Sequence, residues 1–336
     1  MNRPPSEPAA GVHRSGETAV LLLAHGTPNT LDEIPAYLSN VTGGRALPDA
    51  SIEEIRHRYS LIGTAESLSP LTSLTLEQGR LLEEHLGVPV YVGMRNWSPY
   101  IADVVHQMIE NGVSSAVAIC LAPQNSRTST GMYRRAVMNA AGDTLKVDFV
   151  TGWADHPLLA DAFGERLRPV LERLRAETAG EVPVLFTAHS VPCRTVQTQS
   201  AVAPDPYSVE AKTTARLVAS RLGIAAGQWF FAFQSQGLSG GPWIGPTVED
   251  TLTALQQQGY TRVILQPIGF LCDHVEILYD VDISFREFAA NLGMSLERPE
   301  SLNGSALLTA ALAQLASEGF NRLNSERSVE ASPVTL

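Results

Sequence analysis

Two carboxylates at helical spacing mark one corner of the sequence as a candidate site for chemistry. In the segment 268–282, an apolar strand stops before Gly269, and an acidic helix is expected to begin with Asp273 as its N-cap. In that helix Glu276 and Asp280 lie four residues apart and share one face. The pattern fits either an acidic helix face in solvent or the acidic part of a site that receives cations.

Two histidines are expected at equivalent strand ends that could face this corner. His25 closes the apolar run 18–25, and His189 closes the run 182–189; each stands in an Ala-His-small-x-Pro pattern. Ligands of open parallel sheets bind beyond the carboxyl ends of the strands, so His25 would look across a cleft at His189 and Glu276. Imidazoles with carboxylates suit a divalent metal such as Fe(II), and they can also act as bases. The alternative for each is a core histidine bonded to backbone.

Composition limits the partners. The chain has 336 residues, with 24 basic and 35 acidic side chains and a formal charge of -11, which argues against nucleic acid and leaves cations open. Its three cysteines have no paired spacing, so neither disulfides nor an iron–sulfur or zinc cluster is indicated, and a cytoplasmic location is expected. No apolar run is long enough to predict a transmembrane segment.

The order of elements predicts an α/β fold in two halves. Residues 1–16 and 323–336 are expected to be disordered tails, and the domains are predicted at 17–152 and 153–322. Apolar strands alternate with helices in both, as in parallel sheets flanked by helices. Strands are predicted at 18–25, 89–94, 115–121, 145–150, 182–189, 228–233 and 261–266, and helices at 31–40, 51–60, 71–86, 99–111, 130–141, 157–176, 208–222, 247–257, after Asp273, and at 305–318.

A loop rich in glycine and proline, 233–246, carries Trp243 and could form a wall for a flat ligand. The alternative is a rigid loop anchored by one buried ring. Phosphate binding is the obvious rival function of such a loop. No phosphate-binding glycine motif follows a predicted strand in the required context, so nucleotide binding is disfavoured.

Several side chains of the first half could hold carboxylates of a ligand. Arg58, Tyr59, Ser69 and Tyr133 offer a guanidinium group and hydroxyls suited to that task. For Ser69 and Ser129 the alternative is helix capping.

These residues together resemble the ferrochelatase family, whose members insert Fe(II) into a porphyrin. The resemblance extends from about residue 18 to 320 and is carried by the motifs 58–63, 69–71, 186–192, 205–207, 233–237, 242–246 and 269–280. It implies two Rossmann-like domains that face each other across a porphyrin cleft. It also implies that His189 and Glu276 handle metal and protons, that Asp280 continues an acidic path for the ion, and that the segment at Arg58 contacts the porphyrin. Fe(II) would be the only metal, without an iron–sulfur cluster, and we expect a monomer.

The segment 121–126, which leads to Tyr133, is more similar to the branch that uses coproporphyrin III than to the protoporphyrin IX branch. In that branch a tyrosine commonly stands at the position of His25, so we expect His25 to be an iron ligand from the face opposite His189. The alternatives are another tetrapyrrole chelatase, for cobalt or sirohydrochlorin, and a non-catalytic haem-binding protein.

Four departures from the family's pattern qualify the resemblance. Residues 64–68 lengthen a loop that would meet the porphyrin, and Thr42 and Gly43 stand where coproporphyrin-type members often carry arginines. Gln124 replaces a histidine of some members, and Ser284 replaces an acidic residue one turn beyond Asp280. The change at Thr42 and Gly43 affects a partner for a propionate group of the porphyrin, and the change at Ser284 affects the outer end of the cation path.

Overall fold

Two parallel four-stranded sheets form the frame of the molecule. The computed structural model describes residues 18–64, 67–178, 181–197, 204–237 and 240–330. The strand order is β2-β1-β3-β4 in the first sheet and β6-β5-β7-β8 in the second, so the two halves repeat one topology. The predicted α/β class with two helix-flanked parallel sheets is confirmed.

The first sheet contains β1 (Thr18–Ala24), β2 (Val90–Met94), β3 (Ser115–Cys120) and β4 (Lys146–Val150), and the second contains β5 (Val184–His189), β6 (Trp229–Gln234), β7 (Arg262–Pro267) and β8 (Ser295–Glu297). The helices are η1 (Leu31–Glu33), α1 (Ile34–Val41), α2 (Asp49–Ile62), α3 (Leu71–Leu86), α4 (Ile101–Glu110), α5 (Thr130–Ala141), α6 (Pro157–Thr178), α7 (Cys193–Val196), α8 (Tyr207–Arg221), α9 (Val248–Gln257), α10 (Val275–Leu278), η2 (Asp280–Phe285), α11 (Arg286–Asn291) and α12 (Ala306–Glu330).

The central strands β1 and β5 are apolar on both faces because both faces are covered by helices. One core joins the halves: it contains Val20 and Leu22 of β1, Phe186 of β5, and buried side chains of α6 and α12. A second core lies between the first sheet and helices α4 and α5, and a third between the second sheet and helices α9 and α11. The shared core fixes the two sheets relative to each other.

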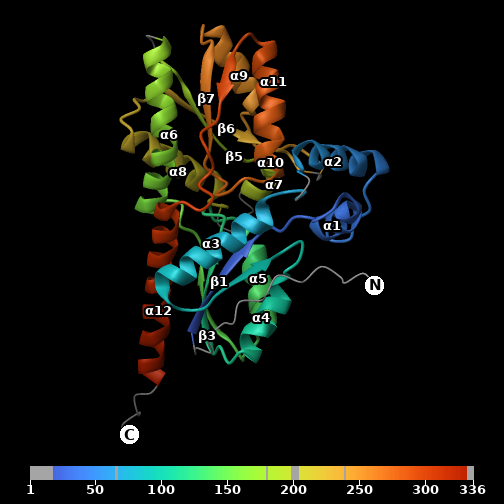
Figure 1. The fold of residues 1–336 in the computed structure, drawn as a ribbon, viewed down its shortest axis with the longest axis vertical. Coiled ribbons are helices and arrows are strands. Elements are labelled where there is room, and N and C mark those ends of the chain that lie inside the picture. Colours follow the sequence, from blue (N-terminus) through green and yellow to red (C-terminus); the bar gives the residue numbers. More distant parts are fainter. Residues whose placement is uncertain (1–17, 65–66, 179–180, 198–203, 238–239, 331–336) are drawn as a thin grey trace, which may run out of the picture.

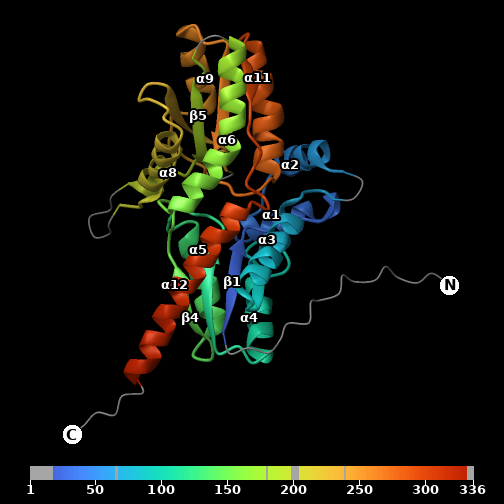
Figure 2. The same ribbon diagram turned by 60° about the vertical axis from the view of Figure 1, so that its left-hand side comes forward.

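The last helix, α12, returns from the second half to the first. In Figures 1 and 2 it runs from the junction of the halves down along the first half, where it packs on α3, α6, β3 and β4. Gly319 permits the close approach to the sheet, since a Cβ there would lie 2.6 Å from both Cγ atoms of Val117. Arg322 adds two hydrogen bonds of 2.9 Å to Asp148 on β4.

The structure corrects the predicted C-terminal tail and adds elements that the sequence pattern missed. Helix α12 continues to Glu330, past the predicted start of the tail at 323, while residues 331–336 and the predicted tail 1–16 lie outside the described residues. The short elements β8 and α7 were not predicted, and the acidic helix after Asp273 is divided into α10, the π-helical η2 and α11. In the described residues no helix is long and apolar enough to cross a membrane.

Helices α1 and α2 form a projection beside the junction of the two halves (Figure 1). They have a small core of their own, made by Ile34, Tyr37, Leu38 and Tyr59. Trp97 from the first half and Val275 from the second pack against this core. Helix α2 therefore reaches the segment that carries Glu276 in the opposite half.

Candidate functional site

A cavity of about 1230 Å³ lies where the carboxyl ends of β1 and β5 meet helix α2 and segment η2. A smaller cavity of about 510 Å³ adjoins it. We call them the large and the small cavity. They share part of their lining, and the shared residues include His25, Tyr59, His189, Trp243 and Glu276. The two predicted histidines and the predicted glutamate therefore stand at one junction.

Glu276 is held between two imidazoles. Its Oε1 lies 3.2 Å from His189 Nε2, and its Oε2 lies 3.4 Å from His274 Nε2. The other ring nitrogen of each histidine faces a backbone carbonyl: His189 Nδ1 donates to Ser190, and His274 Nδ1 donates to Cys272 at 3.1 Å. Both nitrogens of the His189 ring face oxygen acceptors, so the geometry favours a protonated His189 beside a charged Glu276 carboxylate.

Electrostatics strengthen this arrangement. Burial acts to raise the pKa of Glu276, but the charges and hydrogen bonds of His189 and His274 outweigh it and hold that pKa well below its ordinary value. Burial acts to lower the pKa of His189, yet the Glu276 carboxylate raises it above 6.5. The two shifts have opposite directions, so both favour the pair of a charged Glu276 carboxylate and a protonated His189.

His25 has a different protonation state. It follows β1 directly, and its exposed side chain lines both cavities. Burial, and then the nearby Arg95 charge, lower its pKa to about 4. The Asn96 side-chain amide lies 3.0 Å from Nε2, so a neighbouring residue fixes the ring. A neutral imidazole of this kind is a competent ligand for iron.

Asp280 lies on the wall of the large cavity, where its side chain is tied on both sides. Ser235 donates a hydrogen bond to its Oδ2, and Arg58 Nη1 lies 3.6 Å from its Oδ1. Burial, and then the Glu276 charge, raise the pKa of Asp280 to about 6. The same Arg58 pairs with Glu54 at 3.0 Å and lies over the Tyr279 ring, so Asp280 joins the projection to the second half.

The predicted porphyrin contacts divide between the two cavities. Arg58 lines the large cavity, Tyr133 lines the small one, and Tyr59 and Trp243 line both. The Tyr59 hydroxyl is bonded to Thr27 at 3.1 Å, and the Trp243 ring lies 6.3 Å from that of His189. Trp243 therefore forms a wall beside the histidine, although residues 238–239 of its loop lie outside the described residues.

Ser69 is not brought to either cavity. It is buried just before α3, and its hydroxyl accepts from the Leu71 backbone amide at 3.4 Å, but the N-cap of α3 is Pro70, so Ser69 is not the cap residue either. Ser129 behaves in the opposite way, since it lines the small cavity and makes no side-chain cap on α5. Of the two serines, the structure gives the ligand-facing position to Ser129.

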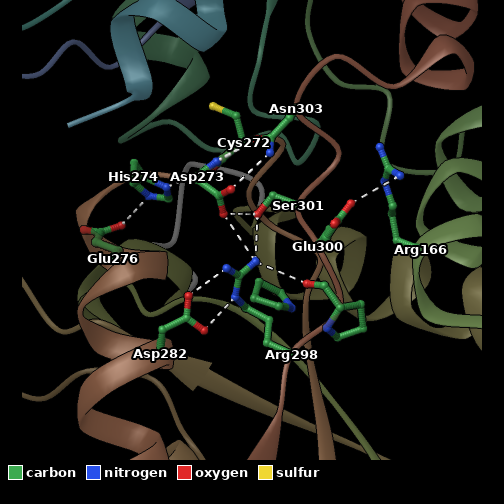
Figure 3. A network of polar contacts seen from close by, with 12 residues as sticks. Arg166, Cys272, Asp273, His274, Glu276, Asp282, Arg298, Glu300, Ser301 and Asn303 are labelled. Carbon is green, nitrogen blue, oxygen red and sulfur yellow. Dashed lines mark hydrogen bonds and ion pairs between the residues drawn. The ribbon is translucent and has the colours of Figure 1, made fainter. Parts of the chain in front are cut away.

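The expected N-cap role of Asp273 is wrong. The residue at the N-cap of α10 is His274, which makes no side-chain capping bond. The Asp273 carboxylate instead accepts from Ser301 at 2.7 Å and Asn303 at 3.0 Å, and Arg298 lies 3.3 Å away (Figure 3). These partners lie far along the chain, so a local helix pattern could not reveal them.

His274 is the site residue that the sequence interpretation missed. Residues two apart on a helix point in different directions, so helical spacing separates it from Glu276. His274 instead precedes the helix with an extended backbone, φ −162°, and this turns its ring back onto the carboxylate (Figure 3). Its only signal was its place inside the motif 269–280.

Gln124, one of the departures from the family pattern, lies in the wall of the small cavity and joins the two halves. Its side-chain amide donates to the Ile268 carbonyl at 3.1 Å and to Thr214 at 3.2 Å. Among the described residues no three His, Cys, Asp or Glu side chains form a preformed metal-binding group. His189, Glu276, His25 and Asp280 therefore share one pair of cavities without forming a closed cage.

The sequence and the fold both match known chelatases. A ferrochelatase family model matches residues 17–319. A ferrochelatase of Acidobacterium capsulatum is 62% identical over 93% of this chain and 97% of its own, and a coproporphyrin III ferrochelatase of Geobacillus kaustophilus is 33% identical over 88% and 94%. The sirohydrochlorin chelatase SirB of Bacillus subtilis shares the fold, with a TM-score of 0.56 at 9% identity over 90% of this chain and 96% of its own. The chain belongs to the ferrochelatase family.

Proposed function

We propose that this enzyme inserts Fe(II) into a porphyrin, with the macrocycle bound at the junction of the two cavities. The observation that carries the proposal is the Glu276 carboxylate between His189 and His274, on one side of that junction, with neutral His25 on the lining of the same cavities. Metal insertion requires a group that attracts a cation, a base that takes pyrrole protons, and walls that hold a flat ring. The site offers all of these.

In the proposed mechanism Glu276 supplies the negative charge that receives the cation. His189 shares its proton with that carboxylate. Once this proton has passed to solvent, Nε2 can accept one pyrrole proton, release it to solvent and then accept the second. Because the pKa of His189 is raised, the base form grows as pH rises through a value above 6.5. Insertion should therefore accelerate over this range of pH.

Asp280 is proposed to form the next step of the cation path, on the solvent side of Glu276. Its carboxylate lines the large cavity, and Ser284 further along the chain lines the same wall. Ser284 brings no charge to the path, but Glu54, Glu249 and Asp250 also line this cavity. The inner part of the path would run through Asp280 and Glu276.

His25 is proposed to bind the iron of the product from the face opposite His189. Its pKa of about 4 keeps the ring neutral at physiological pH, and neutral imidazole is a good ligand for Fe(II). The His25→Ala product complex should lose the absorbance features of imidazole ligation. An unchanged spectrum would refute this role.

Coproporphyrin III is proposed as the preferred porphyrin. It carries a propionate on every pyrrole ring, whereas protoporphyrin IX carries propionates along one edge only. Cationic groups line both cavities: Arg45 and Arg58 line the large one, and Arg95 and Arg194 the small one. The Arg95 guanidinium lies over the Tyr133 ring at 5.4 Å, and its Nε donates to the Asn96 side chain at 3.3 Å. Carboxylates at opposite edges of one substrate would match this distribution.

We also propose that the enzyme acts as a cytoplasmic monomer that needs no iron–sulfur cluster. Both halves of the site come from one chain, and Cys120, Cys193 and Cys272 are free thiols. Light scattering and iron analysis of the purified protein test these statements.

Turnover tests the function. The pure protein should metallate coproporphyrin III with Fe(II), and protoporphyrin IX more slowly, as followed by absorbance. Rapid binding of haem without insertion would indicate a carrier, and activity on sirohydrochlorin alone would indicate the other chelatase class.

A further inference from the structure

The segment 273–282 carries His274, Glu276 and Asp280, and its regular structure consists of two short elements. Helix α10 is a single turn without a side-chain N-cap, and η2 is a π-helical turn. Such turns are rare and short, and they depend on their surroundings for stability. Contacts from outside the segment, such as the hydrogen bond of 3.0 Å from the Gln234 side chain to the Glu276 carbonyl, should therefore help to fix the position of Glu276.

Arg298, directly after β8, supplies that support at both ends (Figure 3). Its Nε and Nη2 donate to the two carboxylate oxygens of Asp282 at 2.9 and 2.7 Å. Its Nη1 lies 3.3 Å from Asp273 Oδ1 and donates to Ser301 at 3.2 Å. The side chain is only 10% exposed, so these charge-assisted bonds lie in a poorly solvated place.

Asp273 is also tied to the other half of the molecule. Its backbone amide and its carboxylate bond to the two ends of the Asn303 amide, each at 3.0 Å. The carbonyl of Asn303 in turn accepts from Gln78 of helix α3 at 2.8 Å. The N-terminal end of the segment is thereby fixed to the first half through one continuous set of hydrogen bonds.

We propose that Arg298 is a positioning residue, which joins Asp273 to Asp282 and thereby keeps the Glu276 carboxylate between His189 and His274. The inference rests on the proposed function. Arg298 lines neither cavity. The charges that lower the pKa of Glu276 are those of His189 and His274. Arg298 would therefore act on the carboxylate indirectly, through the backbone between Asp273 and Asp282.

The test compares Arg298→Met, which keeps the length but removes the charge, with Arg298→Lys, which keeps the charge but cannot bridge two carboxylates as a planar guanidinium does. A small displacement of a catalytic group reduces turnover by about tenfold to a hundredfold, so kcat should fall by this factor in Arg298→Met while the porphyrin KM stays unchanged. Arg298→Lys should be intermediate.

A second readout needs no turnover. In an NMR titration of the His189 ring, the midpoint should fall in Arg298→Met, because the carboxylate that raises it is no longer held at 3.2 Å. Arg322→Met is the control: it removes another guanidinium with two carboxylate hydrogen bonds, to Asp148 on the edge strand β4 of the first sheet. It should change thermal stability without changing kcat or the midpoint.

A folded Arg298→Met with wild-type kcat and midpoint would overturn the proposal, as would an equal loss of kcat in Arg322→Met. If Arg298→Met does not fold, Asp282→Asn decides in the same way, since Arg286 at 3.3 Å still supports that side chain. Asp282→Asn should lose less kcat than expected for Arg298→Met, and the midpoint of the His189 titration should fall by less. If neither kcat nor the midpoint changes, the positioning role of Arg298 is refuted. If the wild type itself lacks turnover, the proposed function fails, while the titration still tests Arg298.

Discussion

Asp280→Asn should stabilise the protein at neutral pH while it slows iron insertion. The carboxyl is buried and lies near the charged Glu276, and these two causes raise its pKa from 3.8 to about 6. The folded protein therefore binds this proton more tightly than the unfolded chain does. Between these pH values folding takes up a proton, so stability falls as pH rises through the interval, and the loss is complete above pH about 6.

The shift sets the size of the effect. A rise of about two pKa units, at about 1.4 kcal/mol each, means that the charged Asp280 lowers the free energy of unfolding by about 3 kcal/mol at neutral pH. The favourable contacts of the charged form with Ser235 and Arg58 are already contained in that shift. An asparagine can still accept from Ser235 and carries no charge, so we expect a gain of about 1–3 kcal/mol at pH 7.5.

Urea unfolding at pH 7.5 and near pH 4 measures this gain, which should be large at the higher pH and small at the lower. Asp282→Asn is a matched control from the same segment; it should destabilise the protein, because it removes the charge that pairs with Arg298. In the same preparations, Asp280→Asn should raise the KM for Fe(II). A variant less stable than wild type at pH 7.5 would refute this account of the Asp280 environment.

Three further predictions concern the walls of the site. Arg58→Met removes the cation that lowers the pKa of Asp280, so initial rates should show a KM for Fe(II) that is raised near pH 6 and nearly normal at pH 8; equal effects at both would contradict it. Gly237→Ala would bring a Cβ to 2.9 Å from Trp243 Cη2, so the porphyrin KM should increase several-fold in steady-state assays while stability stays near wild type. Arg95→Met should raise the KM for coproporphyrin III more than that for protoporphyrin IX, and a uniform change would exclude a propionate contact.

The main elements and the place of the site were predictable from sequence because they depend on local periodicity. The apolar runs that end at His25 and His189 mark strands buried on both faces, and the repeated strand order places these two ends at one pair of cavities. The acidic pair at Glu276 and Asp280 also reached the cavity wall, although the helix that was expected to carry both is interrupted.

What the sequence could not reveal depends on contacts between distant segments. Asp273 has the residue type of an N-cap, but partners more than 20 residues away bind its carboxylate instead. His274 reaches Glu276 through an extended backbone that helical spacing does not describe. Ser69 fits equally well as a cap or a ligand contact in sequence, but in the structure Pro70 is the N-cap of α3 and Ser69 lines neither cavity.

Iron insertion by His189→Ala tests the central claim most directly. Loss of a general base reduces rates by about a hundredfold to ten thousandfold, so initial rates with Fe(II) and coproporphyrin III should fall by at least the lower factor. His156→Ala, a histidine that lines neither cavity, should keep the wild-type rate. Near-normal insertion by folded His189→Ala would contradict the account.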